Sequence, residues 1–176
     1  MTNMEHGNTY SKSYSISSNL HINSMGLKNH IMNFETYNLF LDDIREPREC
    51  LSYTNEPRYG TREWVVVRTH DEFVQTVVNR WANGEFPELV SFDHDLADEH
   101  YDPTMYHGID NYNEIAEQFK EKTGLDSANF FVQWCIDQSI QLPECLVHSM
   151  NPAGRERIKQ SIHDYERFYK RFGNRG

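Results

Sequence analysis

The sequence lacks the paired cysteines of a disulfide framework or a zinc site. Its three cysteines, Cys50, Cys135 and Cys145, show neither CxxC nor Cys/His zinc spacing. We therefore expect reduced thiols in a cytoplasmic protein. The chain also lacks any apolar run as long as a membrane span, and its N-terminus lacks the apolar segment of a signal peptide. These absences argue against membrane insertion and secretion.

Positive charge is scarce as well. The chain carries 17 Lys and Arg against 27 Asp and Glu, a formal net charge of -10. Binding to the phosphate backbone of extended duplex nucleic acid requires a cationic surface, so that class of partner is not expected. A single nucleotide or an RNA end, held by a few local cations or a metal ion, is compatible with this charge. A homo-oligomer is also compatible with the sequence.

The length of 176 residues indicates one domain, or one domain with a tail. Residues 1–33 are rich in Ser, Asn and His and have no firm helical or strand period. We expect an accessory or mobile N-terminal extension there, with an extra strand or an interaction arm as the alternatives. Residues 34–176 form the predicted folded domain.

Apolar runs alternate with helical patterns from residue 34 onward. The runs "YNLFLDD", "WVVVRT", "FPELVSFD" and "ECLVHSM" predict four strands, and a long polar connection is expected between the first two. Four helices are expected. Their boundary signals are a Thr69/Glu72 capping box, Asn111 as cap with Gly124 as stop, Asp126 as cap, and Asn151 as cap with Pro152 following. This alternation predicts an α/β three-layer sandwich with a mainly parallel sheet of four to five strands.

Polar side chains follow each predicted strand. Ligands of parallel sheets bind beyond the carboxyl ends of the strands, where strand order reverses. All four ends fall on one edge of such a sheet, so these side chains are expected to converge. They are Asp42, Asp43 and Arg45 after the first strand, Arg68 after the second, Asp93, His94 and Asp95 after the third, and His148, Ser149 and Asn151 after the fourth.

The acids in this set predict a metal site. Like charges packed together raise each other's pKa unless a cation intervenes. An oxygen-rich cluster suits Mg²⁺ or Mn²⁺. The expected ligands are Asp42, Asp43, Asp93 and Asp95. Neutralisation by Arg45 or Arg68 alone is the alternative.

His148 has two interpretations of similar weight: a satisfied structural histidine, or a general acid/base beside the acid cluster. Strand alternation places His94 on the face opposite Asp93 and Asp95, which favours an orienting role for it.

The stretch "HSMNPAGRERI" predicts an anion site. Asn151 and Pro152 begin a helix whose free N–H groups point at the sheet edge. Gly154 permits a close approach, and Arg155 is a cation in a first turn where the helix dipole disfavours one. Phosphate binding explains that placement, and pairing with a surface acid is the alternative.

As a set, "LFLDDIREP", "WVVVRTHDEF", "SFDHDL", "KTG" and "HSMNPAGRERI" resemble the cyclic-phosphate-processing receiver-like domain, a divergent relative of the response-regulator receiver, over about residues 36–160. The resemblance implies a flavodoxin-like α/β sandwich. It implies that Asp42 and Asp43 match the receiver's metal-binding acids and Asp93 its phosphorylated position. The usual receiver lysine at the last strand is absent, which argues against a phosphorelay.

The resemblance further implies action on cyclic phosphates, such as 2′,3′-cyclic ends of RNA. The leading hypothesis is a metal-assisted phosphoesterase. In it Asp93, His148 and His94 serve catalysis, and the phosphate is held by Arg45, Arg68, Ser149, Asn151 and Arg155. Two other hypotheses are a binding module that sequesters a cyclic or phosphorylated nucleotide without chemistry, and a receiver-like interaction domain.

Overall fold

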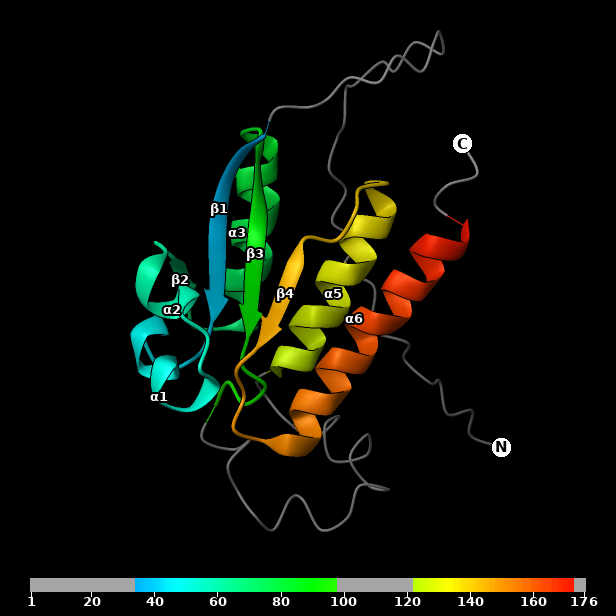
Figure 1. Cartoon of the computed structure of the whole chain (residues 1–176). Coiled ribbons are helices and arrows are strands. Elements are labelled where there is room, and N and C mark those ends of the chain that lie inside the picture. The colour runs from blue at the N-terminus through cyan, green and yellow to red at the C-terminus, as the bar shows by residue number, and fades with distance from the viewer. Residues whose placement is uncertain (1–33, 98–121, 173–176) are drawn as a thin grey trace, which may run out of the picture. The chain divides into compact units, whose positions relative to one another are not determined.

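The structure, a computed structural model, describes residues 34–97 and 122–172, with side chains up to residue 167 (Figure 1). The N-terminal extension, the expected helix at Asn111, and residues 98–121 and 173–176 lie outside the described residues. Within the described part, no helix is long and apolar enough to cross a membrane.

The sheet has four strands, all parallel. They are β1 (Glu35–Leu41), β2 (Val65–Val67), β3 (Glu85–Phe92) and β4 (Glu144–Val147), in the order β2-β1-β3-β4. All four predicted strands are confirmed, as is the parallel sheet. Strand order reverses between the central strands β1 and β3, because the chain crosses to β2 on one side and returns to β3 on the other.

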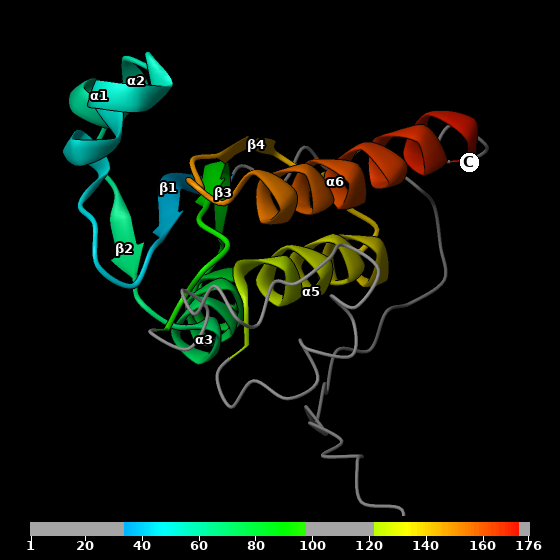
Figure 2. The same cartoon turned by 90° about the horizontal axis from the view of Figure 1, so that it is seen from below.

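Helices cover both faces of the sheet. Alternation along β1 sends Leu39 and Leu41 to the face packed against α3 (His70–Ala82) and α5 (Gly124–Asp137). Phe40 points to the other face, where short helices cover it: η1 (Pro47–Cys50), α1 (Leu51–Thr54) and α2 (Arg58–Thr61). Figure 2 shows α1 and α2 on the opposite side of the sheet from α3 and α5.

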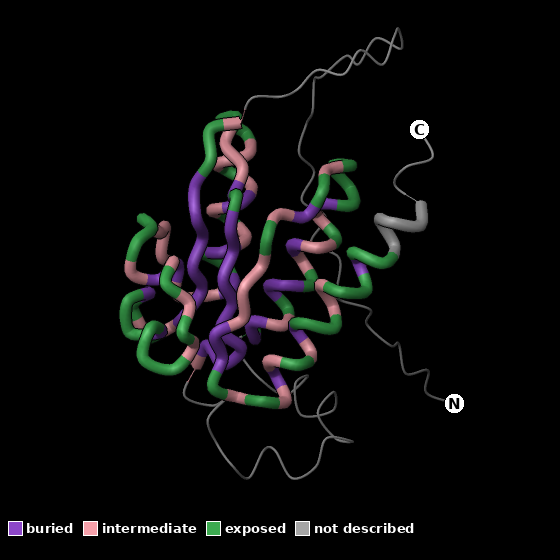
Figure 3. The backbone as a smooth tube through the Cα atoms, viewed as in Figure 1, coloured by how far each residue is buried: buried purple, intermediate pink, exposed green. Residues whose placement is uncertain are grey.

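The last helix, α6 (Pro152–Phe172), packs against α5 and β4. It adds Ile158 and Tyr165 to the larger core. Figure 3 shows buried residues running through β1 and β3 to their carboxyl ends, with exposed residues concentrated on the outer helices. Burial therefore extends to the sheet edge that carries the polar residues.

Two helix boundaries follow the predicted caps. Thr69 caps α3 by accepting a hydrogen bond from the Glu72 N–H at 3.2 Å. The box is not reciprocal, because the Glu72 carboxylate accepts from the Arg68 N–H instead. Asn151 caps α6, since its Oδ1 accepts from the Gly154 N–H at 3.0 Å.

The predicted start of α5 was wrong. The helix begins at Gly124, which was expected to stop a preceding helix, and its N-cap is Thr123 rather than Asp126. Asp126 occupies the third helical position and completes a capping box, accepting from the Thr123 N–H at 2.8 Å. The connection from residue 44 to 63, expected as a long polar connection, contains η1, α1 and α2.

Candidate functional site

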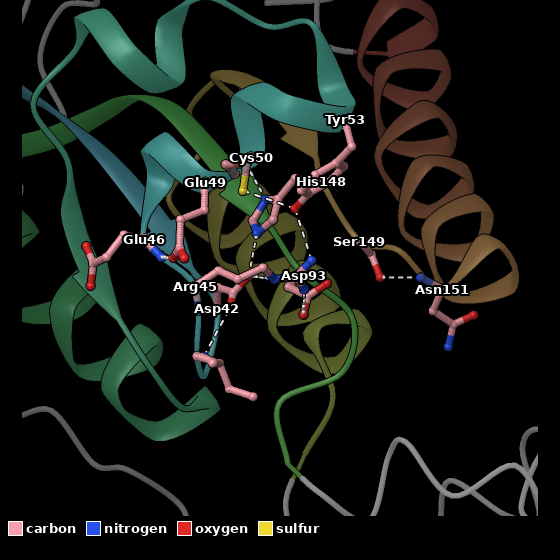
Figure 4. A network of polar contacts seen from close by, with 12 residues as sticks. Asp42, Arg45, Glu46, Glu49, Cys50, Tyr53, Asp93, His148, Ser149 and Asn151 are labelled. Carbon is pink, nitrogen blue, oxygen red and sulfur yellow. Dashed lines mark hydrogen bonds and ion pairs between the residues drawn. The ribbon is translucent and has the colours of Figure 1, made fainter.

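The carboxyl ends of the strands bring three buried polar residues together at the point where strand order reverses. Asp42 follows β1, Asp93 follows β3 and His148 follows β4, with 0%, 1% and 1% of their surfaces exposed. Figure 4 shows these side chains converging below the short helices. The predicted convergence of the strand ends is therefore present for these three.

Arg45 lies between the two aspartates (Figure 4). Its Nε is 2.8 Å from Asp42 Oδ2, and its Nη2 is 2.8 Å from Asp93 Oδ2. One guanidinium thus bridges two carboxylates, the arrangement expected from neutralisation by arginine. The Arg45 side chain is still 20% exposed.

The turn after β1 fixes Asp42 further. Its Oδ1 accepts from the N–H groups of Ile44 at 2.9 Å and Arg45 at 2.6 Å. Burial works against its charge, but hydrogen bonds from His148 and from these two backbone groups prevail and lower the pKa of Asp42. This carboxylate is held as an anion.

Asp93 is the less satisfied of the two acids. Burial raises its pKa, although Arg45 and the backbone N–H of His94 act in the opposite direction. Its Oδ2 bonds to Arg45, whereas its Oδ1 is buried and has no hydrogen-bond partner among the described residues. A buried acceptor without a partner is costly, which makes this oxygen the natural place for a ligand atom, an ion or a proton.

His148 has a protein partner at each ring nitrogen. Nδ1 is 2.7 Å from Ser91 Oγ, and Nε2 is 3.1 Å from Asp42 Oδ2. Its ring stacks on Phe40, with centroids 4.4 Å apart and planes at 11°. Direct proton transfer between His148 and a substrate stays a prediction, and these contacts favour an indirect role.

The site suits a divalent ion in part. Ligand atoms of Asp42, Asp93 and His148 all lie within 4.8 Å of one another. Because both nitrogens of His148 already have partners, the two carboxylates are the better ligands. An ion held by them would take the place of the Arg45 guanidinium and satisfy Asp93 Oδ1. Asp43, which is half-buried, lies outside this group of three.

A second polar group joins the end of β3 to the start of α6. His94 Nδ1 is 2.6 Å from Asp95 Oδ1, and that oxygen also accepts from Asn151 Nδ2 at 3.2 Å. A Cβ on Gly154 would lie 2.2 Å from the His94 ring, so the glycine admits this buried imidazole against the helix. Gly154 thus permits the close approach of a side chain, whereas the approach of a phosphate that the sequence suggested stays a prediction. Ser149 Oγ accepts from the Asn151 N–H at 3.1 Å, shown as a dashed line in Figure 4.

The remaining predicted cations differ in their surroundings. Arg68 donates to the backbone carbonyl of Asp42 at 3.0 Å and to that of Arg45 at 2.7 Å, and it pairs with Glu46. These contacts stabilise the turn after β1. Arg155 lies in the first turn of α6. Its Nε is buried without a hydrogen bond among the described residues and is 4.0 Å from Glu156 Oε1.

The family is settled by comparison with known proteins. The model of the cyclic-phosphate processing receiver domain matches residues 37–164. The chain belongs to this family. The matched region contains β1 from Tyr37 onward, the whole of β2, β3 and β4, and the residues Asp42, Asp93 and His148. The observed α/β sheet agrees with the receiver-like fold. No curated protein and no solved structure matches the chain.

Four residues of the site were not predicted from the sequence. Tyr53 accepts a hydrogen bond from Arg45 at 3.0 Å and donates to Cys50 Sγ at 3.1 Å. Ser91 and Tyr59 continue the contacts of His148 into the core. The one available signal was Ser91, a polar residue inside the apolar run "FPELVSF". The other three, Cys50, Tyr53 and Tyr59, lie in the segment predicted as a long polar connection.

Proposed function

We propose that the chain is a phosphoesterase that opens the cyclic phosphate of a nucleotide or an RNA end at the carboxyl edge of the sheet. Asp93 Oδ1, which is buried and has no hydrogen-bond partner among the described residues, carries this proposal. It lies on a carboxylate bonded to Arg45, a partly exposed side chain whose guanidinium could bind phosphate oxygens. A cation and an open acceptor side by side are what the hydrolysis of a phosphate ester requires.

The reaction assigns a task to each group. A water oxygen attacks phosphorus, one ring P–O bond breaks, the water gives a proton to Asp93, and Asp93 passes that proton to the departing ester oxygen. Asp93, whose pKa is raised by burial, is suited to take the proton from water at Oδ1. Arg45 would stabilise charge on the non-bridging oxygens. Asn151 and Ser149 would orient the α6 N-terminus toward the same edge.

Among the described residues, Asp42 and Asp93 are the best placed to hold a divalent ion, which would take the place of the Arg45 guanidinium. Bound there, such an ion would polarise the phosphoryl group and lower the pKa of an attached water. Asp43 and Asp95 remain candidate ligands from the sequence. The test compares rates in Mg²⁺, in Mn²⁺ and after chelation. A hydrolysis rate that chelation leaves unchanged would indicate that Arg45, and not a divalent ion, stabilises the charge on the phosphate.

The proposed activity is tested with 2′,3′-cyclic mononucleotides and an RNA ending in a 2′,3′-cyclic phosphate, followed by ³¹P NMR. We expect conversion of the cyclic diester to a monoester, and loss of conversion in Asp93→Asn. An Arg62→Lys variant is the matched control, because Arg62 pairs with Glu88 on the outer surface. No monoester in any metal condition would contradict the proposal.

A second candidate is binding without turnover. It is favoured by the contacts of His148, which leave neither ring nitrogen for a substrate, and by the neutralisation of both carboxylates by Arg45. In that case the protein would retain a cyclic nucleotide by its phosphate. Recovery of the intact ligand after denaturing the complex would favour this candidate over the enzyme.

A further inference from the structure

An unbroken run of side-chain hydrogen bonds crosses the core beneath the site. Tyr59 Oη is 2.7 Å from Ser91 Oγ, Ser91 Oγ is 2.7 Å from His148 Nδ1, and His148 Nε2 is 3.1 Å from Asp42 Oδ2. These residues come from α2, β3, the end of β4 and the end of β1. None of the four is more than 2% exposed, so bulk water does not compete for these bonds.

Simple donor and acceptor rules give the run one direction. An ionised Asp42 can only accept, so His148 Nε2 carries a hydrogen and donates it. Among the described residues the Tyr59 hydroxyl has Ser91 Oγ as its partner and donates to it, so the Ser91 hydroxyl is left to donate to Nδ1, which must then be an unprotonated acceptor. A lone pair of Ser91 Oγ in turn accepts from the Tyr59 hydroxyl, whose proton is retained because burial raises the pKa of the phenol.

The opposite direction is unfavourable at both ends. It would set the lone pair of His148 Nε2 against the Asp42 carboxylate. It would also make Tyr59 an acceptor from Ser91, and the described residues provide no second partner for its proton. Leaving such groups unpaired in a buried site costs more than the bonds they replace.

Aromatic packing holds the imidazole in the plane that these bonds require. Phe40 stacks on one face of His148, and Tyr59 meets it edge-on with centroids 5.8 Å apart and planes at 75°. Tyr59 thus contributes both a packing surface and the terminal donor. The ring has little freedom to turn over and exchange its two nitrogens.

We propose that Ser91 and Tyr59 are positioning residues, which hold His148 as the Nε2–H tautomer and aim that N–H at Asp42. His148 then acts through Asp42 and not on the substrate. With His148 and Arg45 on Oδ2 and two backbone N–H groups on Oδ1, Asp42 is satisfied and orients Arg45. Asp93 is left as the carboxylate with an open oxygen. The catalytic consequence rests on the proposed function, whereas the tautomer does not.

The tautomer is tested on the full chain with ¹⁵N-labelled histidine, using long-range ¹H–¹⁵N NMR. The His148 signals are assigned by their loss in His148→Asn. We expect the proton on Nε2 and a hydrogen-bonded, unprotonated Nδ1. In Ser91→Ala the Nδ1 resonance should move toward that of a free ring nitrogen, and in Tyr59→Phe it should move the same way by less. A proton on Nδ1, or an Nδ1 resonance that is unchanged in Ser91→Ala, would overturn the inference.

The positioning role is tested by steady-state kinetics on the cyclic nucleotide. Loss of one buried hydrogen bond predicts a kcat about tenfold lower in Ser91→Ala, with KM within about twofold. Tyr59→Phe should lower kcat in the wild-type background but not in Ser91→Ala, because Tyr59 acts through Ser91.

Tyr165→Phe is the matched control for this kinetic test, since it removes another buried tyrosine hydroxyl, bonded to Ile140 O at 2.8 Å, away from the site. An unchanged kcat in folded Ser91→Ala would refute the role. Absence of turnover in the wild type contradicts the proposed function instead, and the NMR result alone then decides this inference.

Discussion

Replacement of Gly124 by alanine should disrupt the site through the backbone. Gly124 starts α5 against the end of β3, where its N–H donates to His94 O at 2.8 Å. A Cβ at this position would lie 1.7 Å from the carbonyl oxygen of Asp93 and 3.0 Å from Cα of His94. Both atoms belong to the backbone, so no side-chain rotation relieves the contact. Either the end of β3 or the start of α5 has to move, which changes the packing of α5 against Asp93.

The magnitude follows from two opposing effects. Glycine to alanine in an ordinary helix stabilises by up to about 1 kcal/mol. Overpacking costs about 1–3 kcal/mol and occasionally more. Because the obstacle here is backbone, we expect a net loss of about 3 kcal/mol in the free energy of unfolding. For a chain of this size that loss lowers the unfolding temperature by roughly 6–12 °C.

The assay is thermal and urea unfolding of Gly124→Ala beside Gly60→Ala. The control is matched, because a Cβ on Gly60 would meet only the end of the Leu51 side chain, 2.8 Å from its Cδ1, and that flexible group can move. We expect the control to stay within about 1 kcal/mol of the wild type. A Gly124→Ala protein as stable as the wild type would refute the argument.

Three further predictions concern the charges and contacts at the edge. Arg45→Ala leaves two buried carboxylates without their shared cation, so we expect a loss of about 2 kcal/mol in urea unfolding and no binding of cyclic nucleotide in calorimetry, with partial recovery in Arg45→Lys. Burial raises the pKa of Asp93 in the folded protein, so the protonated side chain stabilises the fold relative to the charged one. This contribution to the free energy of unfolding is complete below the unfolded pKa of about 3.9 and is lost as the pH rises through the folded pKa. The stability of Asp93→Asn relative to wild type should therefore fall as the pH is lowered from 7 toward 4, and a rise would contradict the assignment. Tyr53→Phe removes the hydroxyl from Arg45 and should raise KM severalfold with little change in unfolding temperature, which kinetics and calorimetry together will check.

The strand ends could be predicted from the sequence because topology alone brings them together. Apolar runs separated by helical patterns require a parallel sheet, and in such a sheet Asp42, Asp93 and His148 must share an edge. A different, local argument identified Asn151 as a helix cap, since capping depends only on neighbouring residues in the chain. Both predictions needed no knowledge of side-chain conformation.

The partner of each charge could not be predicted in this way. Whether Arg45 or an ion neutralises the two acids depends on side-chain geometry, which sequence spacing does not contain. Tyr59 was missed because its segment reads as a polar connection, although it packs a buried hydroxyl against Ser91. The start of α5 was missed because Gly124 resembles a helix stop. Its actual role, a close approach to Asp93, involves residues far apart in the sequence.

The measurement that tests the central claim most directly is a crystal structure of the protein soaked with a 2′,3′-cyclic nucleotide and Mn²⁺. We predict phosphate density within hydrogen-bond distance of the Arg45 guanidinium, adjacent to Asp93 Oδ1. Anomalous density for any bound manganese should lie between Asp42 and Asp93. A nucleotide found elsewhere, for instance in the groove between α5 and α6 lined by Val132 and Tyr165, with the sheet edge empty, would contradict the account.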